Sequence, residues 1–293
     1  MQDKPENAVL IIGCGDVGRR VAALLQSSRR SPACVVRSSE SRDALLAAGF
    51  DARCIDLDAG GSGADWSGGY SEIYYFAPPP PGGETDPRMT GFLRGLRSDA
   101  PPRRIVYIST SAVYGDCQGA WITEAQPLHP ATPRGRRRLD AERQLMAWCG
   151  ETGCEWVLLR VPGIYGPGKL PLERLRQGLP VLREADAPYT NRIHVDDLAA
   201  ICVAAMASRH GNTVYNVSDG HPSNMTDYFF RVADAAGLPR PAEVSRDEAR
   251  HVLSPGMLSF LNDSRRMDNT RLLRELGISL QYPDLDAGLA SCF

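Results

Sequence analysis

Three glycines between an apolar run and a helical pattern are the residues whose spacing points most directly to chemistry. Gly13, Gly15 and Gly18 in "GCGDVG" give the spacing G-x-G-x-x-G. The run "AVLIIG" before them fits a buried strand, and "CGDVGRRVAALLQSS" carries apolar residues at helical spacing. In that context the first glycine permits a tight turn, the second lets the backbone approach a pyrophosphate, and the third lets the helix pack on the strand. The motif predicts a dinucleotide site in which the N–H groups of Asp16, Val17 and Gly18 face the phosphates.

The residue after the second expected strand usually selects the cofactor. An acidic residue there would bond a ribose 2′-hydroxyl, but this chain has Arg37, followed by Ser38. A guanidinium can pair with a 2′-phosphate through two parallel bonds, so the sequence favours NADP, with NAD as the alternative. In the other interpretation Arg37 is a surface arginine that stacks on adenine without selecting. Asp56 could accept from the adenine amino group, or Asp56 and Asp58 could simply cap a turn.

A basic segment, "PRGRRRLDAERQL", stands out in a chain whose net charge is −2. It holds Arg134, Arg136, Arg137 and Arg138 within five residues. The near-neutral charge of the whole chain argues against nucleic-acid binding. Cations are unfavourable at the positive end of a helix, so at least one of these arginines should have an anionic or polar partner.

The composition excludes several other classes of protein. The chain has 293 residues and is 43% hydrophobic, which suits one large globular domain or a core domain with a smaller lobe. Its eight cysteines form no C-x-x-C pair and its five histidines show no ligand spacing, so neither a disulfide scaffold nor a metal site is expected. No apolar run reaches membrane-spanning length and the first residues lack a signal-peptide pattern, so no membrane contact is expected and the cytoplasm is the expected compartment.

Strand and helix patterns alternate along the chain, which predicts an α/β fold with a Rossmann-type doubly wound parallel sheet. The tetraproline Pro78–Pro81 directly after the fourth strand should form a stiff loop over the strand ends, where such sheets bind ligands. We expect residues 1–166 plus 195–219 to form the dinucleotide-binding domain, and 167–194 plus 220–293 to form a smaller C-terminal substrate lobe. The expected strands are 8–13, 33–37, 52–57, 72–77, 104–110, 155–161 and 213–218, and the expected helices include 41–49, capped by Ser41, 139–149 and 195–208.

Several motifs in order resemble those of one family. "STSAVYGD" at Ser109–Asp116, "RVPGIYGPG", "RIHVDDLA" and "YNVSDG" join the glycine motif over residues 8 to 220. The chain resembles the extended and atypical short-chain dehydrogenases/reductases, the NAD-dependent epimerase/dehydratase family. The resemblance implies a Rossmann core, a smaller substrate lobe and hydride transfer through a nicotinamide.

The resemblance also implies roles for individual residues. Thr110 would hydrogen-bond the reacting oxygen, although a strand-end hydroxyl can equally bond the backbone. Such enzymes carry a tyrosine and, four residues later, a lysine at the start of the next helix; here Arg134 and Arg138 stand at those positions, between Pro133 and Glu142. Arg138 could still hydrogen-bond the nicotinamide ribose. The remaining implied cofactor contacts are Asp56, Leu57, Ala77, Pro78 and Pro162.

The arginine at the tyrosine position limits the chemistry. Arginine stays protonated in proteins, so Arg134 can stabilise an oxyanion but cannot act as a general base. The loss of general acid–base help costs about 10²–10⁴ in rate. Tyr114, Tyr165, Asp116 and Glu124 are the alternative acid–base candidates; the two tyrosines are expected to pack in the core and Glu124 could orient its loop.

Two interpretations follow from the sequence. In the first, the chain is an NADP-preferring oxidoreductase or epimerase-like enzyme that acts on a carbonyl or nucleotide-sugar-like substrate with non-standard acid–base chemistry. In the second, it is a non-catalytic NADP-binding redox sensor that regulates a partner. A replacement base within reach of the nicotinamide would discriminate between them. The sequence predicts no oligomeric state.

Overall fold

The computed structural model describes residues 8–59, 66 and 69–293 and divides into two compact units. The first unit comprises 1–113, 133–160 and 198–215, and the second comprises 114–132, 161–197 and 216–293. The expected boundaries differ at 114–132, 161–166, 195–197 and 216–219, which were expected in the dinucleotide-binding domain. The role expected for each domain stays a prediction.

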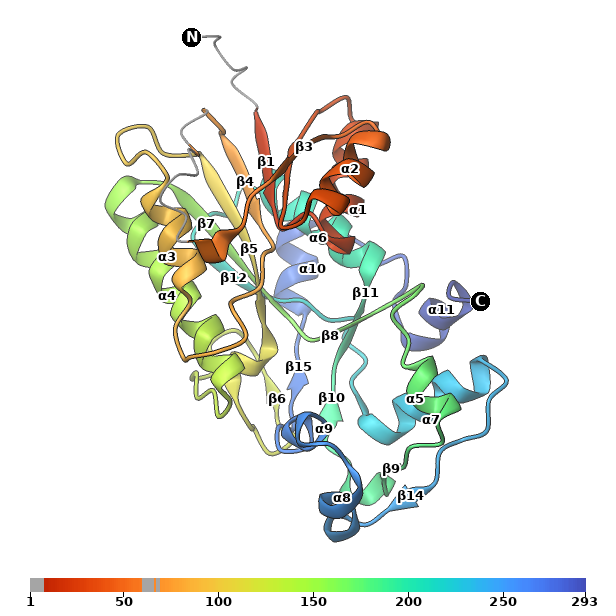
Figure 1. Ribbon diagram of the computed structural model, residues 1–293. Coiled ribbons are helices and arrows are strands. Elements are labelled where there is room, and N and C mark those ends of the chain that lie inside the picture. Colours follow the sequence, from red (N-terminus) through yellow and green to blue (C-terminus); the bar gives the residue numbers. More distant parts are fainter. Residues whose placement is uncertain (1–7, 60–65, 67–68) are drawn as a thin grey trace. The chain divides into compact units, whose positions relative to one another are not determined.

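A seven-stranded sheet forms the first unit, in the order β12-β7-β5-β4-β1-β2-β3 (Figure 1). β1 pairs with β2 and β4, β2 with β3, and β4 with β5, all in parallel. The order reverses between β1 and β4, which makes the carboxyl ends of these strands the usual ligand site of such a sheet. The expected Rossmann-type doubly wound sheet is confirmed. Its strands are β1 (Val9–Ile12), β2 (Ala33–Val36), β3 (Asp51–Cys54), β4 (Glu72–Tyr75), β5 (Arg104–Thr110), β7 (Glu155–Val161) and β12 (Thr213–Asn216).

Helices cover both faces of this sheet. In Figure 1, α3 and α4 lie on one side of the sheet and α1 and α2 on the other. Two expected helix starts were wrong: Ser38, not Ser41, caps α2, and α4 begins at Pro133, six residues before the expected Leu139. The helices are α1 (Asp16–Ser27), α2 (Ser39–Ala47), α3 (Pro87–Arg94), α4 (Pro133–Thr152) and α6 (Val195–Ala207), with 3₁₀ turns η1 (Leu57–Ala59) and η2 (Ser111–Tyr114).

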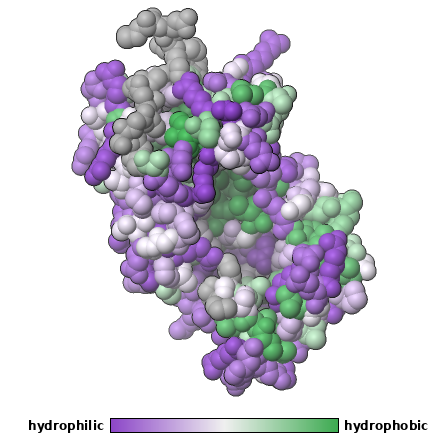
Figure 2. All heavy atoms as spheres, viewed as in Figure 1, coloured by the Kyte–Doolittle hydropathy of each residue, from purple (hydrophilic) through white to green (hydrophobic). Residues whose placement is uncertain are grey.

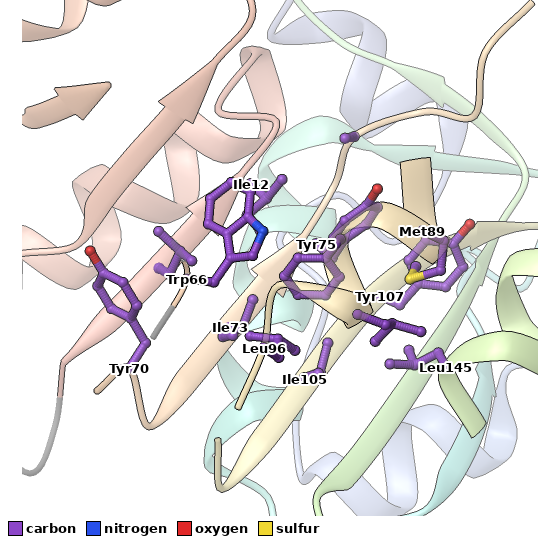
Figure 3. Close-up of a cluster of buried hydrophobic side chains, with 14 of the residues drawn as sticks. Ile12, Trp66, Tyr70, Ile73, Tyr75, Met89, Leu96, Ile105, Tyr107 and Leu145 are labelled. Carbon is purple, nitrogen blue, oxygen red and sulfur yellow. The ribbon is translucent and has the colours of Figure 1, made fainter. Parts of the chain in front are cut away.

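The core of the first unit lies between the sheet and helices α3 and α4. Figure 3 shows Tyr75 and Tyr107 from neighbouring strands packed with Met89 of α3 and Leu145 of α4. β1 and β4 are buried along their whole length. Strands covered on both faces need apolar side chains on both faces, which explains why these runs show no alternation.

The second unit is built from short strands and helices around its own core. Its strand pairs are β8 with β11, β9 with β14, β10 with β13 and β6 with β15. A buried cluster includes Tyr165, Phe229 and Leu285. The elements are β6 (Trp121–Ile122), β8 (Gly163–Tyr165), α5 (Leu172–Arg176), β9 (Val181–Leu182), η3 (Glu184–Asp186), β10 (Tyr189–Thr190), β11 (Arg192–His194), β13 (Ser223–Asn224), α7 (Met225–Ala235), β14 (Glu243–Val244), α8 (Arg246–Val252), α9 (Pro255–Phe260), β15 (Arg266–Met267), α10 (Thr270–Leu276) and α11 (Leu285–Ala290).

Hydrophilic side chains predominate on the face of the molecule that Figure 2 shows, with smaller hydrophobic patches between them. Within the described residues, no helix is both long and apolar enough to cross a membrane. The same part of the chain holds no group of three or more His, Cys, Asp or Glu side chains that could bind a metal ion.

Candidate functional site: the strand ends of the first unit

Gly13 occupies a position that no other residue type fits. Its φ is +83°, a conformation that side chains other than glycine rarely adopt. A Cβ there would lie 2.5 Å from the backbone nitrogen of Ala77 and 2.8 Å from its Cα. The turn after β1 therefore lies directly against the end of β4, which places Ala77 at the glycine loop; its expected cofactor contact stays a prediction.

Gly15 and Gly18 have different surroundings. A Cβ on Gly18 would lie 3.1 Å from the carbonyl oxygen of Gly13, so this glycine lets α1 pack on its own loop. A Cβ on Gly15 would meet nothing within 4 Å, and Gly15 gives α1 no side-chain cap. The first N–H groups of a helix, here those of Val17 and Gly18, have no acceptor within it. The loop thus offers open space above a helix N-terminus, which fits the pyrophosphate of a dinucleotide.

The end of β2 holds the two residues expected to select the cofactor. Arg37 directly follows β2 and is exposed. The Ser38 hydroxyl accepts from the Ser41 backbone N–H at 3.2 Å and donates to the Ser41 hydroxyl at 3.0 Å. Ser38 therefore stabilises the start of α2, while the Arg37 guanidinium lies at the surface beside the predicted site.

The loops after β3 and β4 are joined by a buried arginine that the sequence analysis missed. Arg88 of α3 donates to both carboxylate oxygens of Asp58, at 2.6 and 2.5 Å, and to the carbonyl of Pro78 at 2.7 Å. The bond to Arg88 holds the pKa of the Asp58 carboxyl below its usual value. Asp56 accepts the backbone N–H of Asp58 at 3.0 Å, which is the turn-capping role considered for it. Leu57 begins η1 and packs against the core of the first unit.

The arginine segment begins α4 and fastens it to the loop after β4. Arg137 donates to the carbonyl of Gly83 at 2.6 Å, and Arg136 pairs with Glu84 at 2.8 Å. The backbone N–H of Asp86 donates to Asp140 at 2.7 Å. The expected anionic and polar partners of Arg136 and Arg137 are therefore in the loop of residues 78–86, which these bonds hold beside the strand ends.

Arg138 lies over the end of β5. Its Nη1 donates to the Tyr107 hydroxyl at 3.0 Å and to the Ile108 carbonyl at 2.8 Å. Burial raises the pKa of Tyr107 to about 12, against the opposing charge of Arg138. Arg134 is exposed one helical turn earlier, and residues four apart lie on the same side of a helix. Arg134 and Arg138, where the resemblance implies a tyrosine and a lysine, therefore lie on one side of α4.

Thr110 is half-buried at the end of β5. Its hydroxyl oxygen accepts the backbone N–H of Ala112 at 3.3 Å, which is the structural role considered for it. A hydroxyl that accepts can still donate, so Thr110 retains a donor for a substrate oxygen. Beside it, buried Ser109 donates to Glu142 at 2.5 Å, and Glu142 pairs with buried Arg160 at 2.8 Å. This network joins α4 to β5 and β7 and fixes the helix that carries Arg138.

The alternative acid–base candidates are bonded within the second unit. Tyr114 donates to the Asn216 side chain at 2.6 Å, and the Asn216 backbone N–H donates to Glu124 at 2.9 Å. Tyr165 is fully buried and donates to the carbonyl of Asp284 at 3.1 Å, while Asp116 accepts two backbone N–H groups. Each of the four side chains therefore has a structural role in this unit.

Asp219 is a buried carboxyl of the second unit that the sequence analysis did not identify. It is 5% exposed, and burial raises its pKa to about 6, although the His221 N–H and the charge of Arg192 oppose this shift. A pKa above the ordinary value of 3.8 means that the fold favours the protonated carboxyl. Its contribution to stability is complete below pH 3.8 and is lost as the pH rises through 6.

We expect the free energy of unfolding to fall through this group by about 2–3 kcal/mol as the pH rises from about 4 to about 7. Asp219→Asn keeps an oxygen for the His221 N–H and cannot ionise, so it should remove this part of the pH dependence. Urea denaturation of both proteins at several pH values measures the difference. The same pH dependence in the two proteins would contradict the assignment.

The first unit contains nearly all of the expected cofactor residues. The carboxyl ends of its strands and the segments that follow them hold Gly13, Gly15, Asp16, Val17, Gly18, Arg37, Ser38, Asp56, Leu57, Ala77, Pro78 and Thr110. Arg138 lies on α4, over the end of β5. Pro162 belongs to the second unit, between β7 and β8, and its expected cofactor contact stays a prediction. The pairs Arg88–Asp58 and Arg160–Glu142 were not predicted, because their members lie 30 and 18 residues apart in the sequence. The place of Glu142 in the helix motif after Arg138 was the one signal that could have indicated them.

Comparison with known families agrees with this geometry. Residues 92–218, from α3 to the loop after β12, match the model of the NAD dependent epimerase/dehydratase family. This part of the chain therefore matches an NAD-dependent epimerase/dehydratase domain. The fold and the glycine loop of the chain fit a nicotinamide dinucleotide as the cofactor.

Curated relatives match part of the chain. Protein YeeZ of Escherichia coli K12 is 28% identical over 184 residues, which are 62% of this chain and 59% of YeeZ. The chain thus spans about three fifths of the length of this relative. The dTDP-glucose 4,6-dehydratase of Mycobacterium tuberculosis H37Rv is 30% identical over 135 residues, 42% of this chain and 41% of that enzyme.

Solved structures are similar over nearly the whole chain. A conserved protein of unknown function from Silicibacter pomeroyi has a TM-score of 0.83 and 31% identity, covering 97% of this chain and 96% of that one. UDP-glucuronic acid 4-epimerase from Bacillus cereus, solved with NAD, has a TM-score of 0.77 and 18% identity, covering 97% of both chains. The second likeness shows the fold alone.

Proposed function

We propose that this chain binds NADP(H) and acts as an oxidoreductase or epimerase-like enzyme on a carbonyl or nucleotide-sugar-like substrate, without a tyrosine base on α4. The observation that carries the proposal is the space at Gly15, where a Cβ would meet nothing within 4 Å above an uncapped helix N-terminus. The family supports the same cofactor class. A structural neighbour, MoeE5, was solved with UDP-glucose and NAD.

Different residues at the strand ends would bind different parts of the dinucleotide. The N–H groups of the first turn of α1 would hold the pyrophosphate, and Arg37 would hold the adenosine end. Arg138, fixed by Tyr107 and the Ile108 carbonyl, would hold the nicotinamide ribose. When bound, the nicotinamide supplies or accepts hydride.

The chain's own residues stabilise the reacting oxygen but provide little proton transfer. Thr110 can donate a hydrogen bond to a substrate oxygen, and the charges of Arg134 and Arg138 favour an oxyanion. Neither arginine can release a proton at a working pH, so the proton must be exchanged with solvent. Turnover should therefore be slower by about 10²–10⁴ than with a tyrosine base. Thr110→Ala should lower it further in a screen of carbonyl and nucleotide-sugar substrates with NADPH.

Arg37 should give the preference for NADP. An exposed arginine directly after β2 can form a bidentate pair with a 2′-phosphate, an interaction worth about 1.5–3 kcal/mol. We expect Arg37→Ala to reduce the ratio of NADP to NAD affinity by about 10–100-fold, with NAD affinity nearly unchanged. Calorimetric titration of wild type and variant with both cofactors measures the ratio.

Arg42→Ala is the matched control for Arg37→Ala. Arg42 is a neighbouring arginine on α2 whose side chain pairs with Asp43 at 2.8 Å. Its loss should leave the ratio of the two affinities unchanged. An unchanged ratio in Arg37→Ala would show that Arg37 does not select the cofactor.

A second candidate function is a non-catalytic NADP-binding redox sensor. One observation favours it: Tyr114, Tyr165, Asp116 and Glu124 already have hydrogen-bond partners in the second unit. Tight NADPH binding without turnover of any substrate in the same screen would favour the sensor. Turnover that falls in Thr110→Ala would favour the enzyme.

A further inference from the structure

Arg192 of β11 is a cation without a carboxylate partner. It is half-buried, and its guanidinium carbon lies 4.0 Å from the centre of the Tyr228 ring on α7. Its Nη1 donates to the Asn191 carbonyl at 2.9 Å. No carboxylate of the described residues forms an ion pair with it, although the charge of Asp219 acts on it, and burial lowers its pKa. A guanidinium has five donors, so several remain for a ligand.

Gly163 makes the room that this guanidinium occupies. Arg192 and Gly163 are partners in the parallel pair β11–β8. A Cβ on Gly163 would lie 3.0 Å from Nη1 and 3.3 Å from Cδ of Arg192. Gly163 is exposed and directly follows Pro162, so the guanidinium reaches an accessible part of the backbone next to an expected cofactor residue.

Asp219 provides a second, independent polar group near Arg192. Its backbone N–H donates to the Arg192 carbonyl at 2.9 Å. Its Oδ1 accepts the N–H of His221 at 2.9 Å, but its Oδ2 has no partner although the side chain is only 5% exposed. A buried oxygen without a hydrogen-bond partner destabilises the fold, so a ligand group that hydrogen-bonds to it would be favoured.

We propose that Arg192 binds a carboxylate of the substrate, with Asp219 contacting a neighbouring hydroxyl or carboxyl oxygen. The inference rests on the proposed function and names its substrate class, a carbonyl or sugar compound that carries a carboxylate. A planar guanidinium matches a carboxylate with two parallel bonds.

The charges near Arg192 favour a carboxylate over a diphosphate. One guanidinium balances the single charge of a carboxylate. Asp284, whose charge acts on Asp219, would add to the repulsion of the second charge of a diphosphate.

Matched pairs of probes test the inference on the full chain with NADP⁺ present. UDP-glucuronic acid is compared with UDP-glucose, and pyruvate is compared with methyl pyruvate. Pyrophosphate is a further probe. The affinity of each probe is measured by titration calorimetry up to millimolar concentration. We expect at least one carboxylate probe to bind more tightly than its neutral counterpart. Arg192→Gln should weaken that probe by about 10–100-fold, the range for hydrogen bonds to a charged group.

Two further variants separate loss of the site from loss of the fold. Gly163→Ala keeps Arg192 but displaces its guanidinium, so it should weaken the same carboxylate. Arg240→Gln removes an exposed arginine that stacks on Phe230 of the same helix, α7, and should leave all affinities unchanged.

Three results would overturn the inference: no preference for either carboxylate, equal affinity in wild type and Arg192→Gln, or an Arg192-dependent affinity for pyrophosphate instead. NADPH binding is measured separately on each variant. Its absence from the wild type would refute the proposed function, whereas its presence without carboxylate binding would refute only this inference.

Discussion

Gly15→Ala is expected to weaken NADPH binding by about 100-fold, or roughly 2.7 kcal/mol, while the fold remains intact. The added Cβ would point into space that no protein atom within 4 Å occupies, above the first turn of α1. A methyl group there would keep a pyrophosphate away from the N–H groups of Val17 and Gly18. Charge-assisted hydrogen bonds of this kind contribute about 1.5–3 kcal/mol each, so the loss of one or two accounts for the effect.

Gly13→Ala provides the contrast. Its Cβ would lie 2.5 Å from the Ala77 nitrogen, and its φ of +83° is strained for alanine, so the fold itself should be destabilised by several kcal/mol. Gly15 has an ordinary φ of −79°, and alanine at an N-cap costs about 1 kcal/mol. Urea denaturation and NADPH titration of both variants measure stability and affinity. Unchanged NADPH affinity in a folded Gly15→Ala protein would show that the dinucleotide binds elsewhere.

The sheet was predictable from the sequence because buried parallel strands appear as short, continuous runs of apolar residues. β5 and β7 begin and end at the predicted residues, and β1 and β4 differ by a few residues only. A strand covered on both faces must be continuously apolar, and short polar connections separate such runs clearly. The cap of α2 is Ser38, whose hydroxyl accepts the backbone N–H of Ser41. The sequence could not distinguish the two serines, because each is a possible N-cap residue before the same helical pattern.

The start of α4 was not predictable because its first turns carry arginines instead of an apolar stripe. Arg137 is buried, but its burial depends on the Gly83 carbonyl, which lies 54 residues away in the sequence. The pair of Arg88 and Asp58 could not be predicted for the same reason, because its members lie 30 residues apart in the sequence. Periodicity records which side chains are apolar, whereas the partners of buried charges are set by the tertiary fold. The site could therefore be located from the sequence, but the bonds that hold it could not.

The double variant Arg134→Tyr, Arg138→Lys, which introduces a tyrosine and a lysine at these positions, is expected to raise turnover by about 10²–10⁴. The two positions lie one turn apart on α4, whose attachment through Glu142, Ser109 and Arg160 neither substitution touches. The lysine charge would lower the pKa of the new phenol and allow it to exchange a proton near neutral pH. Turnover is measured with NADPH across the substrate screen, at equal occupancy of the cofactor site.

Arg134→Phe, Arg138→Lys is the control, because it has the ring and the lysine without the hydroxyl. If both double variants turn over at the wild-type rate, the missing tyrosine is not what limits the reaction, and the sensor becomes the better explanation of a site that keeps its cofactor loop. If only the tyrosine variant gains activity, Thr110 and the strand ends already orient a substrate oxygen correctly. Arg134 and Arg138 then limit the reaction at one step, the transfer of the proton.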